Sequence, residues 1–158
     1  MAQQPPPPKP MPRDFDELEF TVESEVWNEY ELKDGTTIHG RIVLQKITRD
    51  PYDPNNLGFK ISPPMWVVYA PSTSRGESNV KLGDRVVGAK FEVHVNRNNE
   101  LWNVYRIIKT GQKLKLKLTI TEISRFVDKF DVDGMPIYDV PSGVSIVFAP
   151  TPDSTNAQ

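Results

Sequence analysis

Alternation of apolar and polar residues is the dominant pattern of the chain. Residues 113–120 read Lys-Leu-Lys-Leu-Lys-Leu-Thr-Ile, which places the leucines on one face of an extended strand and the lysines on the other. Residues 18–23 alternate in the same way. No segment repeats its apolar residues with the helical period. The pattern therefore predicts an all-β fold with roughly eight or more strands.

Short interruptions divide this alternation. Asp34-Gly35 lies between the apolar segments 30–32 and 38–44, which predicts a β-hairpin. The alternation skips within residues 44–47 and again within 120–123, so we expect a β-bulge at each place.

Segments rich in turn residues separate the remaining strands. Residues 50–58 and 126–134 are expected to be loops that carry glycine at positive φ. Residues 81–87 are expected to form a turn followed by a strand. Prolines flank the apolar segments near 65–70 and 142–148, positions that suit edges and bends of a sheet.

The chain resembles itself at a shift of 75 to 79 residues. Trp-Asn-x-Tyr at 27–30 recurs at 102–105, and Val-Val-Tyr-Ala-Pro at 67–71 is matched by Ile-Val-Phe-Ala-Pro at 146–150. We therefore predict an internally duplicated β-barrel or sandwich with pseudo-twofold symmetry, because two copies are too few for a solenoid. Two small barrels in tandem are the alternative. In either case Trp27 should occupy a buried site equivalent to that of Trp102.

The duplication suggests a domain organisation with five segments. Six of the fifteen prolines lie within residues 5–12, which predicts an extended, solvated leader or, alternatively, a ligand for an SH3-like groove. We expect a disordered proline-rich leader at 1–16, a first β repeat at 17–71, a linker with a turn and a strand at 72–90, a second β repeat at 91–150 and a disordered tail at 151–158.

Composition removes most classes of chemistry. The 158 residues include no cysteine and only two histidines, of which His39 alternates with polar neighbours and is expected at the surface. No nucleophilic serine motif and no phosphate-binding glycine motif is present. Residues 128–134 fit a calcium loop poorly, because Lys129 would stand at its first ligand position. We therefore expect a non-enzymatic protein with no metal and no cofactor.

Charge is unevenly distributed although the formal net charge is only −2. Acidic residues cluster early in the chain, and basic residues cluster around the alternating strand near residue 115. The candidate partner-facing acidic patch comprises Glu19, Glu23, Glu25, Glu29 and Glu31. The candidate nucleic-acid or anion patch comprises Arg106, Lys109, Lys113, Lys115 and Lys117.

One short segment resembles a known family. Residues 32–42 (Leu-Lys-Asp-Gly-Thr-Thr-Ile-His-Gly-Arg-Ile) are similar to the first half of the Sm-like RNA-binding motif, which implies a bent antiparallel sheet. The likeness ends there, because Gln45-Lys46 stands where that motif has an aromatic–Asp pair. No RNA-binding residue is carried over from it.

These observations favour a protein–protein interaction subunit or adaptor in an intracellular assembly, with a protein partner or self-association. The alternative is a single-stranded nucleic-acid-binding β-barrel, Sm-like or OB-like, that uses the basic strand face 113–117. No apolar run approaches the ~20 residues of a membrane span, so we expect no membrane partner and a cytoplasmic location.

Overall fold

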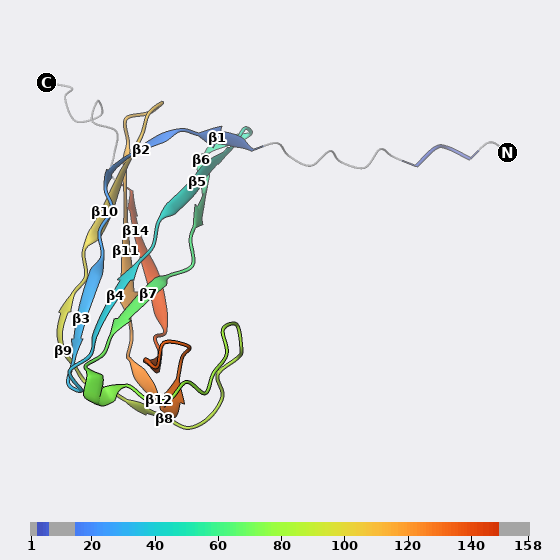
Figure 1. Ribbon diagram of the computed structural model, residues 1–158. Coiled ribbons are helices and arrows are strands. Elements are labelled where there is room, and N and C mark those ends of the chain that lie inside the picture. The colour runs from blue at the N-terminus through green and yellow to red at the C-terminus, as the bar shows by residue number, and fades with distance from the viewer. Residues whose placement is uncertain (1–2, 7–14, 149–158) are drawn as a thin grey trace, which may run out of the picture.

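The computed structural model describes residues 3–6 and 15–148 and confirms the prediction of an all-β fold (Figure 1). Most of the predicted leader and all of the predicted tail lie outside the described residues. The elements are β1 (Asp16–Leu18), β2 (Phe20–Ser24), β3 (Asn28–Leu32), β4 (Thr37–Arg41), β5 (Leu44–Asp50), β6 (Asp53–Ile61), β7 (Met65–Tyr69), the 3-10 turn η1 (Ser72–Ser74), β8 (Lys90–Glu92), β9 (Val95–Asn99), β10 (Trp102–Ile107), β11 (Lys113–Ile120), β12 (Ser124–Phe130), β13 (Pro136–Asp139) and β14 (Ser142–Phe148). The part of the chain that is described contains no helix long and apolar enough to cross a membrane.

The strands form four antiparallel sheets. Sheet A has the order β1-β5-β6, sheet B β14-β11-β10-β2, sheet C β7-β4-β3-β9 and sheet D β13-β12-β8. The sequence predicted a barrel or a sandwich, and the described residues form no closed barrel, because each of these sheets ends in two edge strands. The long strands of sheets B and C form the body, with sheet A at one end and sheet D at the other (Figure 1).

The two four-stranded sheets each contain strands from both halves of the chain. In sheet B, β2 pairs with β10 and places Phe20 opposite Ile107. In sheet C, β9 pairs with β3 and places Val95 opposite Leu32. The chain therefore crosses between sheets after β2 and again after β9, and within the described residues the two predicted repeats do not have separate cores.

Two hydrophobic clusters lie between the sheets. The first joins sheets A and B and contains Leu18, Ile42, Leu44, Ile47, Tyr105, Ile107, Leu114, Leu116 and Leu118. The second joins sheets C and D and contains Tyr30, Leu32, Ile38, Val93 and Ile123. Trp66 packs against both clusters. The alternation in β11 thus gives the predicted result: its leucines are buried, and its lysines are on the opposite face.

The turns are tighter than the sequence suggested. The hairpin at Asp34-Gly35 is confirmed, with Gly35 at φ 87°. The predicted loop 50–58 is wrong, because β5 and β6 continue through it and the Tyr52 amide donates to Asp50 Oδ1 at the turn. Gly58 lies inside β6 opposite Thr48.

The corresponding segment of the second half differs from expectation in the same way. β12 extends to Phe130, so only the end of 126–134 is a turn, with Gly134 at φ 77°. There Asp131 Oδ1 accepts hydrogen bonds from the Asp133 and Met135 amides, which tightens the turn. Residues 81–87 contain a turn but no strand, and the next strand is β8.

One of the two predicted bulges is present. The pairing of β5 with β6 shifts register between Leu44 and Lys46. At 120–123 the chain instead leaves sheet B after Ile120 and enters sheet D at Ser124, so a corner between sheets replaces the bulge. A corner between sheets keeps apolar side chains on the inward face just as a bulge does. A break in the alternation of apolar and polar residues is therefore compatible with either structure.

The prediction that Trp27 is buried is wrong. Its side chain is 42% exposed, whereas Trp102 is half-buried. Both indoles lie on outer faces beside a cation: the Arg41 guanidinium is 5.1 Å from the Trp27 ring centre, and the Lys117 ammonium is 5.1 Å from the Trp102 ring centre. A cation over the ring, together with aliphatic side-chain carbons, covers an indole without burying it.

Candidate functional site

Two buried polar networks stabilise the places where the chain crosses between sheets. In one, Asn28 Nδ2 donates to the Leu118 carbonyl (2.8 Å) and to the Tyr30 hydroxyl (3.1 Å). The Tyr30 hydroxyl donates to Glu100 Oε2 (2.9 Å). Burial raises the pKa of Tyr30, so the hydroxyl stays protonated and can donate.

The second network has the same composition. Asn103 Nδ2 donates to the Ile42 carbonyl (2.8 Å) and to the Tyr105 hydroxyl (3.3 Å), and the Tyr105 hydroxyl donates to Glu25 Oε1 (3.1 Å). Burial raises the pKa of Tyr105 to about 12. Every group in both networks is engaged in holding backbone or side chain, so their chemistry is structural.

The structure divides the candidate basic patch between paired and unpaired side chains. Arg106 Nε lies 2.6 Å from Glu23 Oε1, and Lys113 Nζ lies 3.6 Å from Glu23 Oε2. The hydrogen bond from Arg106 lowers the pKa of Glu23 below its usual value. Lys117 stacks on Trp102, whereas Lys115 is half-buried and Lys109 exposed, each without an ion pair in the described structure. Glu23 therefore neutralises part of the surface that the sequence suggested for nucleic acid.

The candidate acidic patch is spread over several places. Glu23 lies within the basic face, and Glu25 is bound by Arg41 (3.0 Å) and Tyr105 at a crossover. Glu29 and Glu31 lie on β3 and share a small surface depression with Arg97 of β9. Glu19 is exposed between β1 and β2. The structure does not bring these five carboxylates together.

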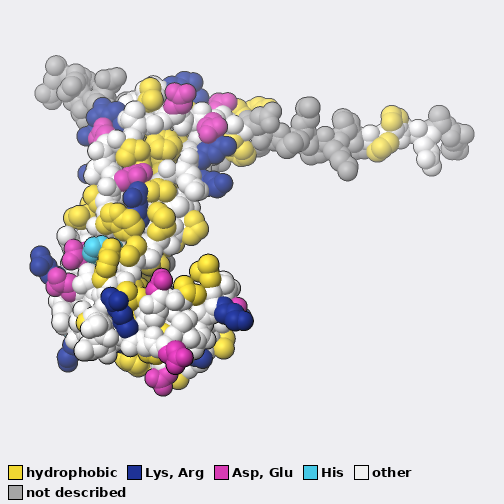
Figure 2. All heavy atoms as spheres, in the orientation of Figure 1, with side chains coloured by type: hydrophobic (Ala, Val, Ile, Leu, Met, Phe, Trp, Pro, Cys, Tyr) yellow, Lys and Arg dark blue, Asp and Glu magenta, His cyan; other side chains and the backbone are white. Residues whose placement is uncertain are grey.

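Two edge strands instead expose a concentration of apolar side chains. On β7, Met65, Val67 and Tyr69 are exposed on the outer face, where the Tyr69 ring contacts the His39 ring at 5.0 Å. On β14, Val144, Ile146 and Val147 are exposed. Figure 2 shows hydrophobic side chains gathered over the middle of the body near the histidine. We call β7 and β14 with these six side chains the open edge.

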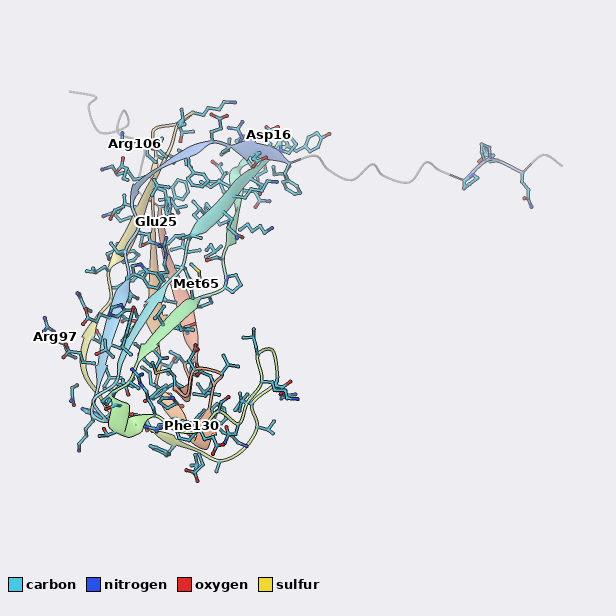
Figure 3. All side chains as sticks on the ribbon, in the orientation of Figure 1. Asp16, Glu25, Met65, Arg97, Arg106 and Phe130 are labelled. Atoms are coloured by element: carbon cyan, nitrogen blue, oxygen red, sulfur yellow. The ribbon has the colours of Figure 1, made fainter. Side chains whose placement is uncertain are left out.

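A groove borders β7. It has a volume of about 570 Å³ and separates the inward face of sheet C from the arm, which consists of sheet D and the connection 75–89. Its walls include Trp66 and Val68 of β7, Leu82 of the connection and Tyr138 of β13. The hollow between body and arm is visible in Figure 2, and Figure 3 shows Met65 on the body and Phe130 in the arm.

A cluster of hydrogen bonds fixes the arm to the body. The Tyr138 hydroxyl of sheet D donates to Asp34 Oδ2 (2.6 Å) and lies within hydrogen-bonding distance of the Thr36 hydroxyl (2.9 Å), both at the hairpin of sheet C. Arg125 Nη1 approaches Asp34 Oδ2 at 3.4 Å. Burial raises the pKa of Asp34, but hydrogen bonds from Tyr138 and Thr36 and the charge of Arg125 lower it by more, so the net shift is downward. The carboxylate therefore stays charged and holds the groove in shape.

Neither the open edge nor the groove emerged from the sequence reasoning. A signal was present for the open edge, because β7 (Met-Trp-Val-Val-Tyr) and β14 (Ser-Gly-Val-Ser-Ile-Val-Phe) contain no charged residue and lie between prolines. No such signal marks the groove, whose far wall combines sheet D with the irregular connection 75–89. The described residues contain no group of three or more His, Asp or Glu side chains placed to hold a metal ion.

Comparison of the chain with protein-family models, with curated proteins and with solved structures finds no match.

Proposed function

We propose that the chain is a non-enzymatic interaction module that binds a protein partner through the open edge. The observation that carries this proposal concerns edge protection. The four sheets have eight edge strands, and within the described residues only β7 and β14 lack a charged side chain. Natural proteins normally guard exposed edges with charge, because an unguarded edge invites pairing with another chain.

The opposite edge strands of the same two sheets do carry charged side chains. Sheet B ends on its other side at β2, which carries Glu23, and sheet C ends at β9, which carries Arg97. The guarded edges lie where the chain crosses between sheets. The unguarded strands β7 and β14 are the outer strands at the other ends of sheets C and B.

We also infer that the chain arose by internal duplication with pseudo-twofold symmetry. The strand orders β7-β4-β3-β9 and β14-β11-β10-β2 correspond when the first and second sets of seven strands are matched. The networks of Asn28, Tyr30 and Glu100 and of Asn103, Tyr105 and Glu25 correspond under the same match. In this interpretation β7 and β14 are equivalent strands, and the open edge is one feature present twice.

Site-specific photo-crosslinking in cells that naturally make the chain tests the proposed function. A photoreactive residue replaces Val67 on β7 or, as the matched control, exposed Asn98 on the guarded edge β9 of the same sheet. We expect cross-linked protein products at position 67 and not at position 98. Equal yields at both positions, or no product at position 67, would contradict the proposal.

Single-stranded nucleic-acid binding is the second candidate function, and it is suggested by the basic face of β11. Lys109, Lys115 and Lys117 have no ion pair in the described structure, since Glu23 pairs only with Arg106 and Lys113. Fluorescence titration with a labelled single-stranded oligonucleotide at low salt decides the matter. We expect no saturable binding; binding that Lys115→Glu abolishes would favour this candidate instead.

A further inference from the structure

The groove next to β7 has the form of a peptide site. Its volume of about 570 Å³ lies within the range of ligand pockets. The wall on the body side includes Ile38, Trp66 and Val68, and the opposite wall includes Leu82 and Val86. The groove therefore lies beside β7, between the body and the arm.

Resting on the proposed function, we propose that an extended, basic segment of another protein pairs with the free edge of β7 and places alternate side chains in the groove. β7 bonds on one side to β4, with Ile38 opposite Val68, and its other side has no strand partner among residues 3–6 and 15–148. Addition of a strand to such an edge is a common mode of peptide recognition.

The side chains of β7 define what the incoming strand must carry. Trp66 and Val68 point inward and line the groove, whereas Met65, Val67 and Tyr69 point outward and are exposed. Neighbouring strands place their side chains side by side on each face. The bound segment therefore meets apolar neighbours on both faces and should carry β-branched or other apolar residues at its centre.

Charge around the groove defines the flanks of that segment. Four carboxylates line the groove, those of Asp84, Asp131, Asp133 and Asp139, against one ammonium, that of Lys81. Asp139 pairs with Lys90, and Asp131 accepts backbone amides. Asp84 and Asp133 are exposed and have no cation partner in the described structure. Lysine or arginine beside the apolar centre would complement them.

The same charges argue against a second copy of this chain as the occupant. A twofold-symmetric contact matches a surface with itself. Pairing β7 with β7 of another copy would bring two acidic groove borders toward each other, with like charges opposed. The Asp34–Tyr138 contact also holds the arm in place before anything binds, which reduces the entropy that binding must overcome.

Fluorescence anisotropy with synthetic peptides tests the inference on the full chain. The probe is Lys-Lys-Thr-Val-Thr-Val-Thr-Lys-Lys, the charge control has Glu in place of each Lys, and the backbone control is the basic peptide N-methylated throughout its centre. We expect saturable binding of the basic probe, with affinity at least tenfold lower for either control. Equal binding of the acidic or N-methylated peptide would overturn the inference.

Charge-reversal variants show whether the basic peptide binds in the groove. Asp84→Lys with Asp133→Lys should weaken the basic probe tenfold or more, whereas the matched pair Asp53→Lys with Glu122→Lys, both exposed and away from the groove, should not. Circular dichroism checks that each variant folds. Equal weakening by both pairs would contradict a site in the groove.

Different results would contradict the proposed interaction function and the inference of a basic strand bound at β7. Cross-links at position 67 together with no peptide binding would leave the interaction function standing and overturn the basic-strand inference. Sedimentation equilibrium covers self-association: a dimer that Val67→Lys dissociates would overturn the inference in favour of a second copy. Loss of the cross-links themselves would overturn the proposed function.

Discussion

The two ends of the molecule use similar strands but fill the space between their sheets differently. Nine buried residues form the cluster between sheets A and B, whereas five form the cluster between sheets C and D. β6 runs for nine residues over the first cluster, and Phe59 of β6 contacts Phe148 of β14 at a ring separation of 6.1 Å. β13, at the other end, has four residues, and the groove lies beside it.

A single pair of inward positions illustrates the difference. Leu116 on β11 is fully buried in the first cluster. Gly40 on β4 leaves space that the indole of Trp66 occupies, and a Cβ at Gly40 would lie 2.2 Å from that ring. The position on β11 is thus filled by a leucine of its own strand, whereas the position on β4 is filled by Trp66 of the neighbouring strand β7. We call the end with sheets A and B the closed end and the end with sheets C and D, where the groove lies, the open end. A shared strand framework can therefore be closely packed at one end and leave a groove at the other.

Truncation of core side chains should separate the two ends most strongly. Leu116→Ala removes a fully buried side chain and should lower the free energy of unfolding by about 3 kcal/mol. Val68→Ala, in the half-buried wall of the groove, should lower it by only about 1 kcal/mol. Urea denaturation of the full chain measures both. Equal losses would mean that the ends are equally well packed.

The two polar networks should respond alike, in contrast to the cores. Asn103→Ala leaves the Ile42 carbonyl and the Val26 amide without their partner, and should cost about 2 kcal/mol. Asn28→Ala should cost a similar amount, because it frees the Leu118 carbonyl and the Leu101 amide. Denaturation of both variants is the measurement. A loss confined to one network would break their correspondence.

Adding a methyl group at the open end tests the role of Trp66. Gly40→Ala forces the new Cβ against the indole and should destabilise the chain by about 1.5 kcal/mol. Trp66→Leu in the same chain provides room, so the double variant should recover part of what Gly40→Ala lost. Strictly additive losses would show that the two residues do not compete for the same space.

The smallest expected effect concerns pH at the open end. The pKa of Asp34 is lowered in the folded chain, so its contribution to stability is present above the usual value of 3.8 and is lost as pH falls through the folded value. Asp34→Asn should therefore destabilise the chain at pH 7 and make less difference at pH 3. Glu23→Gln is the matched change at the closed end, where exposure weakens the ion pair with Arg106. A pH-independent effect of Asp34→Asn would contradict this role.

Local structure was readable from the sequence, whereas pairing between distant strands was not. The alternation in β11 and the Asp34-Gly35 turn depend on neighbouring residues, and both are present as expected. The exchange of β2 and β9 between sheets involves partners more than sixty residues apart, which periodicity does not encode. The position of Glu23 within the basic face also depends on a distant pairing, because β2 pairs with β10 and brings Glu23 to Arg106.

The open edge and the groove were harder to predict than the strands, because both depend on which strands lack a neighbour in the folded chain. Among the described residues no strand covers the free sides of β7 and β14, and the groove lies where sheet D and the irregular connection 75–89 face sheet C. Lack of charge in β7 and β14 is visible in the sequence, but it also fits central strands buried on both faces. Only the sheet order distinguishes those two cases.

Cross-link yields at Val147 and Val22 compare the unguarded and the guarded edge of sheet B. Both valines are exposed on opposite edge strands of sheet B, and Val22 is the more exposed of the two, at 52% against 45%. With a photoreactive residue at each position in turn, we expect partner cross-links at position 147 on the unguarded edge and none at position 22. Equal yields, or a higher yield at position 22, would contradict the assignment of the open edge as the interaction surface.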